Sequence, residues 1–114
     1  MSEDIYGLLA NLDPVLRHPT RFAIVTLLLF SGPQSEGDIA RKLRLQWGPL
    51  TTHLRRLREA GYVEVRKDIT FRGPRTYVRL TDKGIWAYNT YVETLNKIVS
   101  LTRRIQTQDK CVEE

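Results

Sequence analysis

The chain has 114 residues, of which 41% are hydrophobic and 27% are charged, and its formal net charge is +5. This length and composition indicate one globular domain with a modest core, and they exclude an intrinsically disordered chain. The longest apolar run, residues 23–30 with one interruption at Thr26, is too short to cross a bilayer, and the acidic N-terminus lacks the basic region of a signal peptide, so we expect a cytoplasmic protein.

Three helices are predicted in the first part of the chain. Residues 1–12 place their leucines and Ile5 on one side of a short helix. The second helix begins near Pro19, because proline is tolerated in a first helical turn, and it is apolar on nearly all sides, which is typical of the centre of a core. The third helix begins after Ser35, because Ser35 and Asp38 resemble a capping box. It lasts barely two turns.

Residues 46–60 predict a fourth helix with two different faces. Leu50, Leu54 and Leu57 follow the three-and-four spacing of a buried stripe. The opposite face carries hydroxyl and guanidinium groups, and it has no carboxylate before Glu59. Together with the third helix and the short turn between them, this helix completes a helix-turn-helix.

Two β-strands are predicted after this motif. Residues 62–66 and 76–80 alternate between apolar and polar side chains, as half-buried strands do. The segment 67–75 between them contains Gly73-Pro74 as a turn signal, so the two strands form a hairpin with a basic tip, which is a wing. The predicted fold class is therefore mainly α with a small β-hairpin wing (α+β).

Residues 82–108 predict a helix roughly 40 Å long, which is more than the body of so small a domain can cover. We expect its apolar stripe and the helix at residues 1–12 to form a dimer interface. The residues expected there are apolar and recur along one side of each helix: Ile5, Leu8, Leu9, Ile85, Tyr88, Val92, Leu95, Val99 and Ile105. Residues 109–114 are expected to be a flexible tail, in which Cys111 is a free thiol (the commoner case) or joins two subunits by a disulfide.

Positive charge is concentrated in the middle of the chain. Residues 41–83 contain twelve basic and four acidic residues, a balance of +8, whereas the remaining residues carry −3. This asymmetry predicts a polyanionic partner, and a helix that presents Thr and Arg outward suits the major groove of DNA. The residues expected to contact DNA lie in the helix-turn-helix and the wing: Arg41, Lys42, Arg44, Gln46, Trp47, Thr51, Thr52, Arg55, Arg56, Lys67, Arg72 and Arg75. Trp47 could contact the DNA or could instead cover the turn.

No motif for catalysis, metal binding or cofactor binding occurs in the sequence. The only histidines are His18 and His53, and the single Cys111 stands apart from them, so no metal-ligand spacing exists. A phosphate-binding glycine loop and a nucleophile elbow are also absent. We therefore expect a protein that is not an enzyme and holds neither cofactor nor metal. Four aromatic residues could line a pocket for a small-molecule effector or, more commonly, pack in the interface core: Tyr6, Trp86, Tyr88 and Tyr91.

Three segments carry motifs that are specific in combination. Residues 12–21 have the sequence LDPVLRHPTR, residues 50–63 have LTTHLRRLREAGYV, and residues 75–84 have RTYVRLTDKG. Together they resemble the opening, the recognition helix and the wing exit of winged helix-turn-helix transcriptional regulators of the MarR/ArsR-like type, particularly the small archaeal and bacterial ones. This resemblance implies a dimeric repressor or activator, with base contacts from the second helix of the motif and minor-groove contacts from the wing.

Three functions are compatible with these features. The first is sequence-specific binding of double-stranded DNA by a single winged-helix domain, residues 1–114, that acts as a homodimeric regulator on the nucleoid. Its helix 46–60 would lie in the major groove and its wing 67–75 at the minor groove of a pseudo-palindromic site. The second is an architectural protein that coats DNA with little sequence preference. The third, which the basic middle segment makes less favoured, is a winged helix that contacts another protein.

Overall fold

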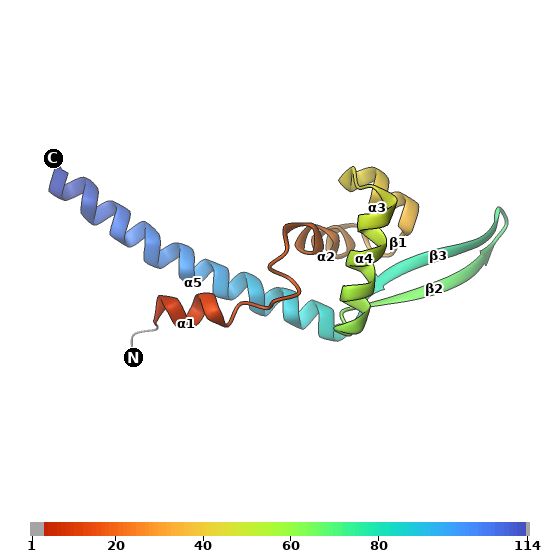
Figure 1. Ribbon diagram of the computed structural model, residues 1–114, viewed down its shortest axis with the longest axis horizontal. Coiled ribbons are helices and arrows are strands. Elements are labelled where there is room, and N and C mark those ends of the chain that lie inside the picture. The colour runs from red at the N-terminus through yellow and green to blue at the C-terminus, as the bar shows by residue number, and fades with distance from the viewer. Residues whose placement is uncertain (1–3, 114) are drawn as a thin grey trace.

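The structure, a computed structural model, describes residues 4–113, with side chains described up to residue 106. Five helices and three short strands follow one another along the described chain: α1 (Ile5–Ala10), α2 (Pro19–Ser31), β1 (Gln34–Ser35), α3 (Glu36–Leu43), α4 (Trp47–Glu59), β2 (Val63–Thr70), β3 (Gly73–Leu80) and α5 (Asp82–Glu113). Figure 1 shows a head of α2, α3 and α4 with the base of the sheet, from which the β2–β3 hairpin projects on one side and α5 on the other. The predicted fold class, mainly α with a hairpin wing, is confirmed.

The core lies where α2 meets α3, α4, the sheet and the first turns of α5. Its buried side chains come from every one of these elements and from the loop before α2: Leu16, Ile24, Val25, Leu28, Ile39, Leu50, Leu54, Leu57, Val63, Val78, Ala87 and Tyr91. The predicted stripe of α4 leucines is confirmed, since all three are buried. Helix α2 contributes Ile24, Val25 and Leu28 to the core, as its apolar sequence predicted, but its C-terminal end is uncovered, since Phe30 is 91% exposed and Leu29 is 38% exposed.

The helix starts show which local interactions the sequence uses. The backbone N–H of Asp38 donates to the Ser35 hydroxyl over 3.1 Å, as the capping-box pattern predicted. At α2 the cap is His18, whose Nδ1 accepts from the N–H of Thr20 over 3.1 Å. The turn between α3 and α4 reverses at Arg44, which has a left-handed backbone with φ 55° and ψ 47°. Of these three features, the reversal at Arg44 lies between the two helices of the helix-turn-helix and lets α4 follow α3 after a short turn.

The sheet has the strand order β1-β3-β2 and is antiparallel. The two-residue strand β1 was not predicted, because a strand so short leaves no alternating pattern. The hairpin turn was predicted at Gly73-Pro74, and this position is wrong. The ladder continues until Thr70 pairs with Gly73, so Phe71 and Arg72 form the turn. Gly73 follows it with φ +105°, a conformation that glycine adopts without a Cβ penalty.

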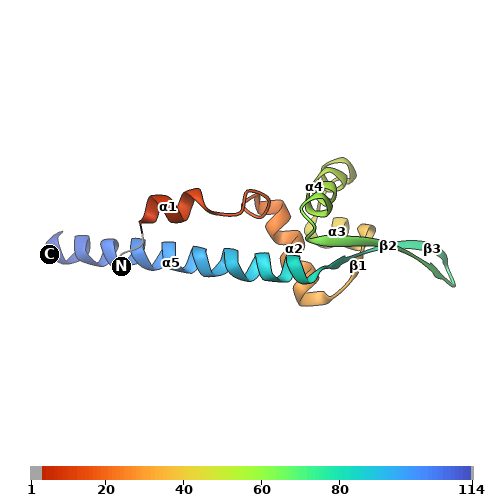
Figure 2. The ribbon, with the colours of Figure 1, turned by 90° about the horizontal axis from the view of Figure 1, so that it is seen from below.

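Helix α5 has 32 residues, which corresponds to about 48 Å. It continues to Glu113, whereas the sequence prediction ended it near Gln108 and gave residues 109–114 as a flexible tail. The side chain of Cys111 and the whole of Glu114 lie outside the described residues. Helix α1 lies antiparallel alongside α5 in both views (Figures 1 and 2). None of the described helices is both long and apolar enough to cross a membrane.

Candidate nucleic-acid interface

The outer face of α4 is the most continuous polar surface of the helix-turn-helix. Leu50 and Leu57 are 1% and 0% exposed on the inner face, while Thr51, Thr52, Arg55, Arg56 and Trp47 are all exposed. The threonine hydroxyls donate to the carbonyls of Trp47 and Gly48, over 2.9 and 3.4 Å respectively. Because the hydroxyl protons are used within the helix, each threonine offers its methyl group and the lone pairs of its hydroxyl oxygen to a partner, as an acceptor rather than as a free donor.

The first turn of α4 has no side chain that satisfies its backbone donors. Gln46 occupies the N-cap position but its side chain makes no capping hydrogen bond. Pro49 has no N–H, so the N–H groups of Trp47 and Gly48 are the donors of the first turn that have no acceptor within the helix. They lie at the positive end of the helix dipole. A Cβ built on Gly48 would meet no atom within 4 Å. Packing within the chain therefore does not require glycine at this position.

Helix α4 is held against the N-terminal end of α2 by a group of aromatic and cationic side chains. The rings of His18 and His53 lie 4.4 Å apart between centroids, and Arg21 Nη1 lies 3.4 Å from His53 Nδ1. Arg21 Nε also donates to the carbonyl of Val15 over 2.7 Å. Burial first, and then the charges of His18 and Arg21, lower the pKa of His53. His53 is therefore a packed neutral residue that supports the outer face.

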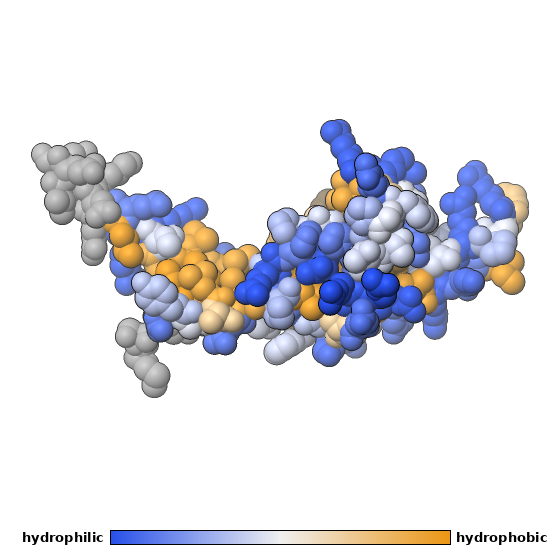
Figure 3. Space-filling model, in the orientation of Figure 1, coloured by the Kyte–Doolittle hydropathy of each residue, from blue (hydrophilic) through white to orange (hydrophobic). Residues whose placement is uncertain are grey.

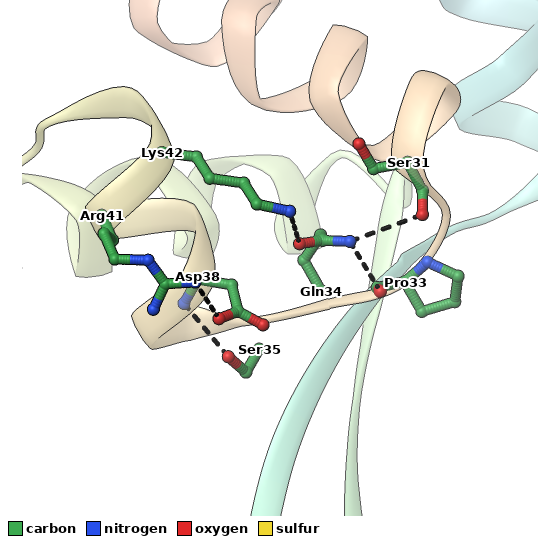
Figure 4. Close-up of polar contacts among 7 residues, drawn as sticks. All are labelled: Ser31, Pro33, Gln34, Ser35, Asp38, Arg41 and Lys42. Atoms are coloured by element: carbon green, nitrogen blue, oxygen red, sulfur yellow. Dashed lines mark hydrogen bonds and ion pairs between the residues drawn. The ribbon is translucent and has the colours of Figure 1, made fainter.

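The basic residues of α3 already have partners within the head (Figure 4). Arg41 pairs with Asp38 over 2.8 Å on the exposed surface. Lys42 Nζ donates to Gln34 Oε1 over 2.8 Å, and the buried Gln34 amide also donates from Nε2 to the carbonyls of Ser31 and Pro33. Arg44 is exposed in the turn. These contacts hold Arg41 and Lys42 on the surface beside the turn: the charge of Arg41 is paired with Asp38, whereas Lys42 bonds a neutral amide and keeps its full charge.

The wing carries cations on both of its faces. Register places Lys67 opposite Thr76 and Asp68 opposite Arg75, so Lys67 and Arg75 point to different sides of the hairpin. Arg72 is exposed in the turn. The predicted wing residues are therefore spread along the hairpin and over both of its faces.

Some basic surface residues were not among the predicted contacts. Arg66 and Arg79 lie with Tyr77 and Asp68 around a hollow of about 300 Å³ at the base of the wing. Arg58 is exposed on the flank of α4, two turns after Thr51. The charge count of residues 41–83 included all three arginines, but only the strand register and the burial pattern show which surface each occupies.

The predicted interface stripe of α5 is partly covered by the same chain. Tyr88 stacks on Phe22 with 5.1 Å between ring centroids, and its hydroxyl lies 2.9 Å from that of Thr26. By contrast, four members of the set are clearly exposed: Leu9 (45%), Ile85 (37%), Val99 (41%) and Ile105 (56%). Figure 3 shows apolar side chains gathered over α1 and α5, and hydrophilic ones over α4. The single chain thus leaves an apolar face open beside its basic face.

A hollow of about 490 Å³ separates the start of α5 from the loop before α2. Trp86 and Tyr91 line it, whereas Tyr88 packs on Phe22 and Tyr6 is 76% exposed. The pocket of four aromatic residues considered from the sequence is therefore not formed within one chain. Tyr62 donates a hydrogen bond to Asp13 across this hollow, and burial together with that bond raises the pKa of Tyr62 to about 12.

Comparison with known proteins agrees with this geometry. A family model described as a winged helix DNA-binding domain matches residues 20–99. The chain is 32% identical over 68 residues to an uncharacterised protein of Methanocaldococcus jannaschii, an overlap that covers 60% of this chain and 71% of that protein.

Two solved structures extend the likeness over most of the fold. A transcriptional regulator homologue from Pyrococcus horikoshii has a TM-score of 0.75 and 28% identity, and the match covers 84% of this chain and 93% of that one. The transcriptional repressor BigR from Xylella fastidiosa has a TM-score of 0.60 and 30% identity over 77% of this chain and 83% of its own. The resemblance to winged-helix transcriptional regulators predicted from the three sequence motifs is confirmed.

Proposed function

The chain belongs to the family of winged helix DNA-binding domains, and we propose on this premise that it is a transcriptional regulator that binds specific duplex DNA sites as a homodimer. The outer face of α4 is the observation that carries the proposal. This face is held rigidly by buried leucines, it presents Thr and Arg side chains, and no carboxylate interrupts it before Glu59. Such a face matches the donor and acceptor pattern of the major groove. The location of the protein in the cytoplasm, associated with the nucleoid, stays a prediction from the sequence.

Each part of the basic surface has a distinct task in this proposal. Thr51, Thr52, Arg55 and Arg56 read base edges or adjacent phosphates in the major groove, and Gln46 and Trp47 contact the DNA where α4 begins. Arg41, Lys42 and Arg44 hold the phosphate backbone. Lys67, Arg72 and Arg75 place the wing at the minor groove. The contacts to phosphate fix the register, and those to base edges give the specificity.

The homodimer is supported by the apolar face that one chain leaves open along α1 and α5. Large exposed apolar surfaces of this kind mark association sites in proteins of this size. A two-fold dimer presents two copies of α4, so its site is pseudo-palindromic with half-sites about 34 Å apart, one turn of the duplex.

Selection of bound sequences from random duplexes tests the proposal most directly. The expected result is an enriched motif with two-fold symmetry and half-sites one or a few helical turns apart. Binding without any enriched motif, at fixed physiological salt, would instead identify an architectural protein. If no duplex bound even at about 50 mM salt, the winged helix would serve protein contact.

Replacement of Arg55 tests the readout by α4. We expect Arg55→Ala to lose about 1–3 kcal/mol of binding free energy on the selected site, and to relax the preference at one base position, if Arg55 pairs with guanine. Arg104→Ala removes the same charge from the exposed far part of α5 and is the matched control. Equal losses on selected and random duplexes would make Arg55 a phosphate contact, which leaves base readout to its neighbours.

A further inference from the structure

The tip of the wing carries the most exposed apolar side chains of the DNA-facing half of the molecule. Phe71 is 101% exposed and Ile69 is 92% exposed. Ile69 lies directly opposite Pro74 in the strand ladder, so the two share one face of the hairpin just behind the turn that holds Phe71. Apolar side chains are visible at this end of the hairpin in Figure 3. The wing therefore ends in a small apolar tip, defined by Ile69, Phe71 and Pro74.

The apolar tip is fixed in shape, although no part of the chain that the structure describes covers it. The Thr70 hydroxyl donates to the carbonyl of Gly73 over 2.7 Å and accepts from the N–H of Arg72 over 3.3 Å. These two bonds close the turn around Phe71. The hairpin carries the tip away from the head in both views (Figures 1 and 2). No side chain of the described head can therefore bury Phe71.

The charges around the tip indicate which kind of partner buries it. Lys67, Arg72 and Arg75 lie within a few residues of Phe71, and Asp68, opposite Arg75, is the single acid of this segment. Cations that flank a narrow apolar point complement the phosphates on the two sides of a DNA groove. Apolar side chains of this kind can enter between base pairs from the minor groove, unstack them and kink the duplex.

We propose that Phe71, with Ile69 beside it, is a wedge that inserts between two base pairs from the minor groove and bends the DNA. This inference rests on the proposed DNA-binding function and adds that the bound DNA is bent. Arg72 and Arg75 hold the phosphates on either side while Phe71 replaces part of the lost base stacking. The wedge favours sites with an easily unstacked pyrimidine–purine step beneath the wing, and so contributes specificity without any base-edge hydrogen bond.

The experiment uses the full chain and a selected duplex that carries a fluorophore pair at its ends and 2-aminopurine at successive positions beneath the wing. The wild-type protein should shorten the end-to-end distance and raise 2-aminopurine fluorescence at one step. Phe71→Ala should abolish both signals and weaken binding roughly tenfold, whereas Phe71→Leu, which keeps an apolar wedge, should retain most of each signal. Phe30→Ala, at a phenylalanine that is 91% exposed on α2, is the matched control and should change neither.

The outcomes separate the wedge from the function on which it rests. Because Phe71 is fully exposed, Phe71→Ala should keep the wild-type melting temperature, so a lost signal cannot be assigned to unfolding. Tight binding to the selected duplex with equal bending by wild type and Phe71→Ala would overturn the wedge and leave the regulator proposal intact. Such a result would point to a protein as the partner of the tip. Failure of the wild type to bind any duplex would overturn both.

Discussion

Gly48 is a residue whose identity the chain itself does not explain. It lies in the first turn of α4, its backbone has an ordinary helical sign of φ, and a built Cβ would meet no atom within 4 Å. Glycine within a helix lowers stability by about 0.5–1 kcal/mol relative to alanine. A glycine that packing within the chain does not require is expected where another molecule approaches the backbone closely, as a DNA phosphate would at this helix start.

We therefore predict opposite effects of Gly48→Ala on folding and on binding. The free energy of unfolding should rise by up to about 1 kcal/mol, as measured by urea titration. Affinity for the selected duplex should fall, because the added methyl group would hold the phosphate away from the N–H groups of the first turn. Gly37→Ala, at a similarly uncrowded glycine in the first turn of α3, should stabilise the fold without weakening DNA binding. Unchanged affinity of the Gly48 variant would show that nothing contacts this turn.

His53 gives the fold a predictable dependence on pH. Burial, His18 and Arg21 lower its pKa below the ordinary value of 6.5, so the unfolded chain takes up the proton first as the pH falls. The free energy of unfolding is therefore unaffected by His53 well above pH 6.5, decreases as the pH falls through 6.5, and levels off below the folded-state pKa. Urea titrations across this window should show a smaller decrease for His53→Gln than for wild type. An identical decrease would assign the effect to other groups.

For single residues, the sequence predicted burial better than it predicted the hydrogen-bond partner of each polar group. The α4 leucines and the Ser35 cap follow from spacing and from local chemistry alone, because both depend on neighbours within one turn. The cap of α2 is His18, which is not one of the usual N-cap residue types, and Lys42 meets Gln34 only because the fold brings β1 and α3 together. Sequence patterns hold no signal for such pairs.

Gly84 determines how the wing and the long helix meet. A Cβ on this residue of the first turn of α5 would lie 2.2 Å from the carbonyl oxygen of Tyr62, which is backbone and cannot move aside. The same junction is closed by Thr81, whose hydroxyl donates to the carbonyl of Gly61 over 2.6 Å and accepts from the N–H of Gly84 over 3.0 Å. The close approach of α5 to the base of β2 therefore requires glycine.

Gly84→Ala should destabilise the fold by about 1–3 kcal/mol, since relief of the clash must move α5 or the base of the sheet. Thermal unfolding followed by circular dichroism measures the effect, with Gly37→Ala as the control that adds a methyl group without a clash. A melting temperature equal to that of the wild type would mean that the junction adjusts at no cost. In that case the orientation of α5 could not be ascribed to this contact.

The elements themselves were largely predictable, and their ends were not. Apolar patterns together with capping and turn signals identified all five helices and both strands of the hairpin, and the pattern is clearest in α4, which has one buried side. The hairpin turn was misplaced because Gly73 and Pro74 are common turn residues, whereas here Gly73 follows the turn and Pro74 pairs with Ile69. The end of α5 was misplaced because a helix beyond the head has no packing boundary that a pattern could reveal.

The whole molecule is elongated, with extents of 65 × 29 × 22 Å, and its long dimension follows α5. One chain cannot bury the outer part of such a helix, and Val99 and Ile105 remain exposed on it, with Leu9 exposed on α1 beside it. The proposed dimer would cover these side chains and set the separation of the two α4 helices. The sequence alone indicated the apolar stripe of α5. Only the fold shows that Phe22 already covers Tyr88, a member of that stripe, within one chain.

A charge placed on this open face should separate association from folding. Val99 is 41% exposed in the single chain, so Val99→Glu should change the free energy of unfolding of a monomer by no more than about 0.5 kcal/mol. In a dimer the same carboxylate would be buried without a partner, at a cost of several kcal/mol. Sedimentation velocity should therefore show a dimer for the wild type and a monomer for the variant. Phe30→Glu, on the exposed end of α2, controls for the loss of an exposed apolar side chain.

The same variant tests whether the dimer matters for DNA recognition. A monomer contacts one half-site, so Val99→Glu should bind an isolated half-site as the wild type does but lose the additional affinity of the full palindrome. Because the slope of log affinity against log salt is proportional to the number of phosphates neutralised, that slope should fall to about half on the full site. A Val99→Glu protein that sediments as a dimer, or that keeps the full-site slope, would place the subunit contact elsewhere than on the α1–α5 face.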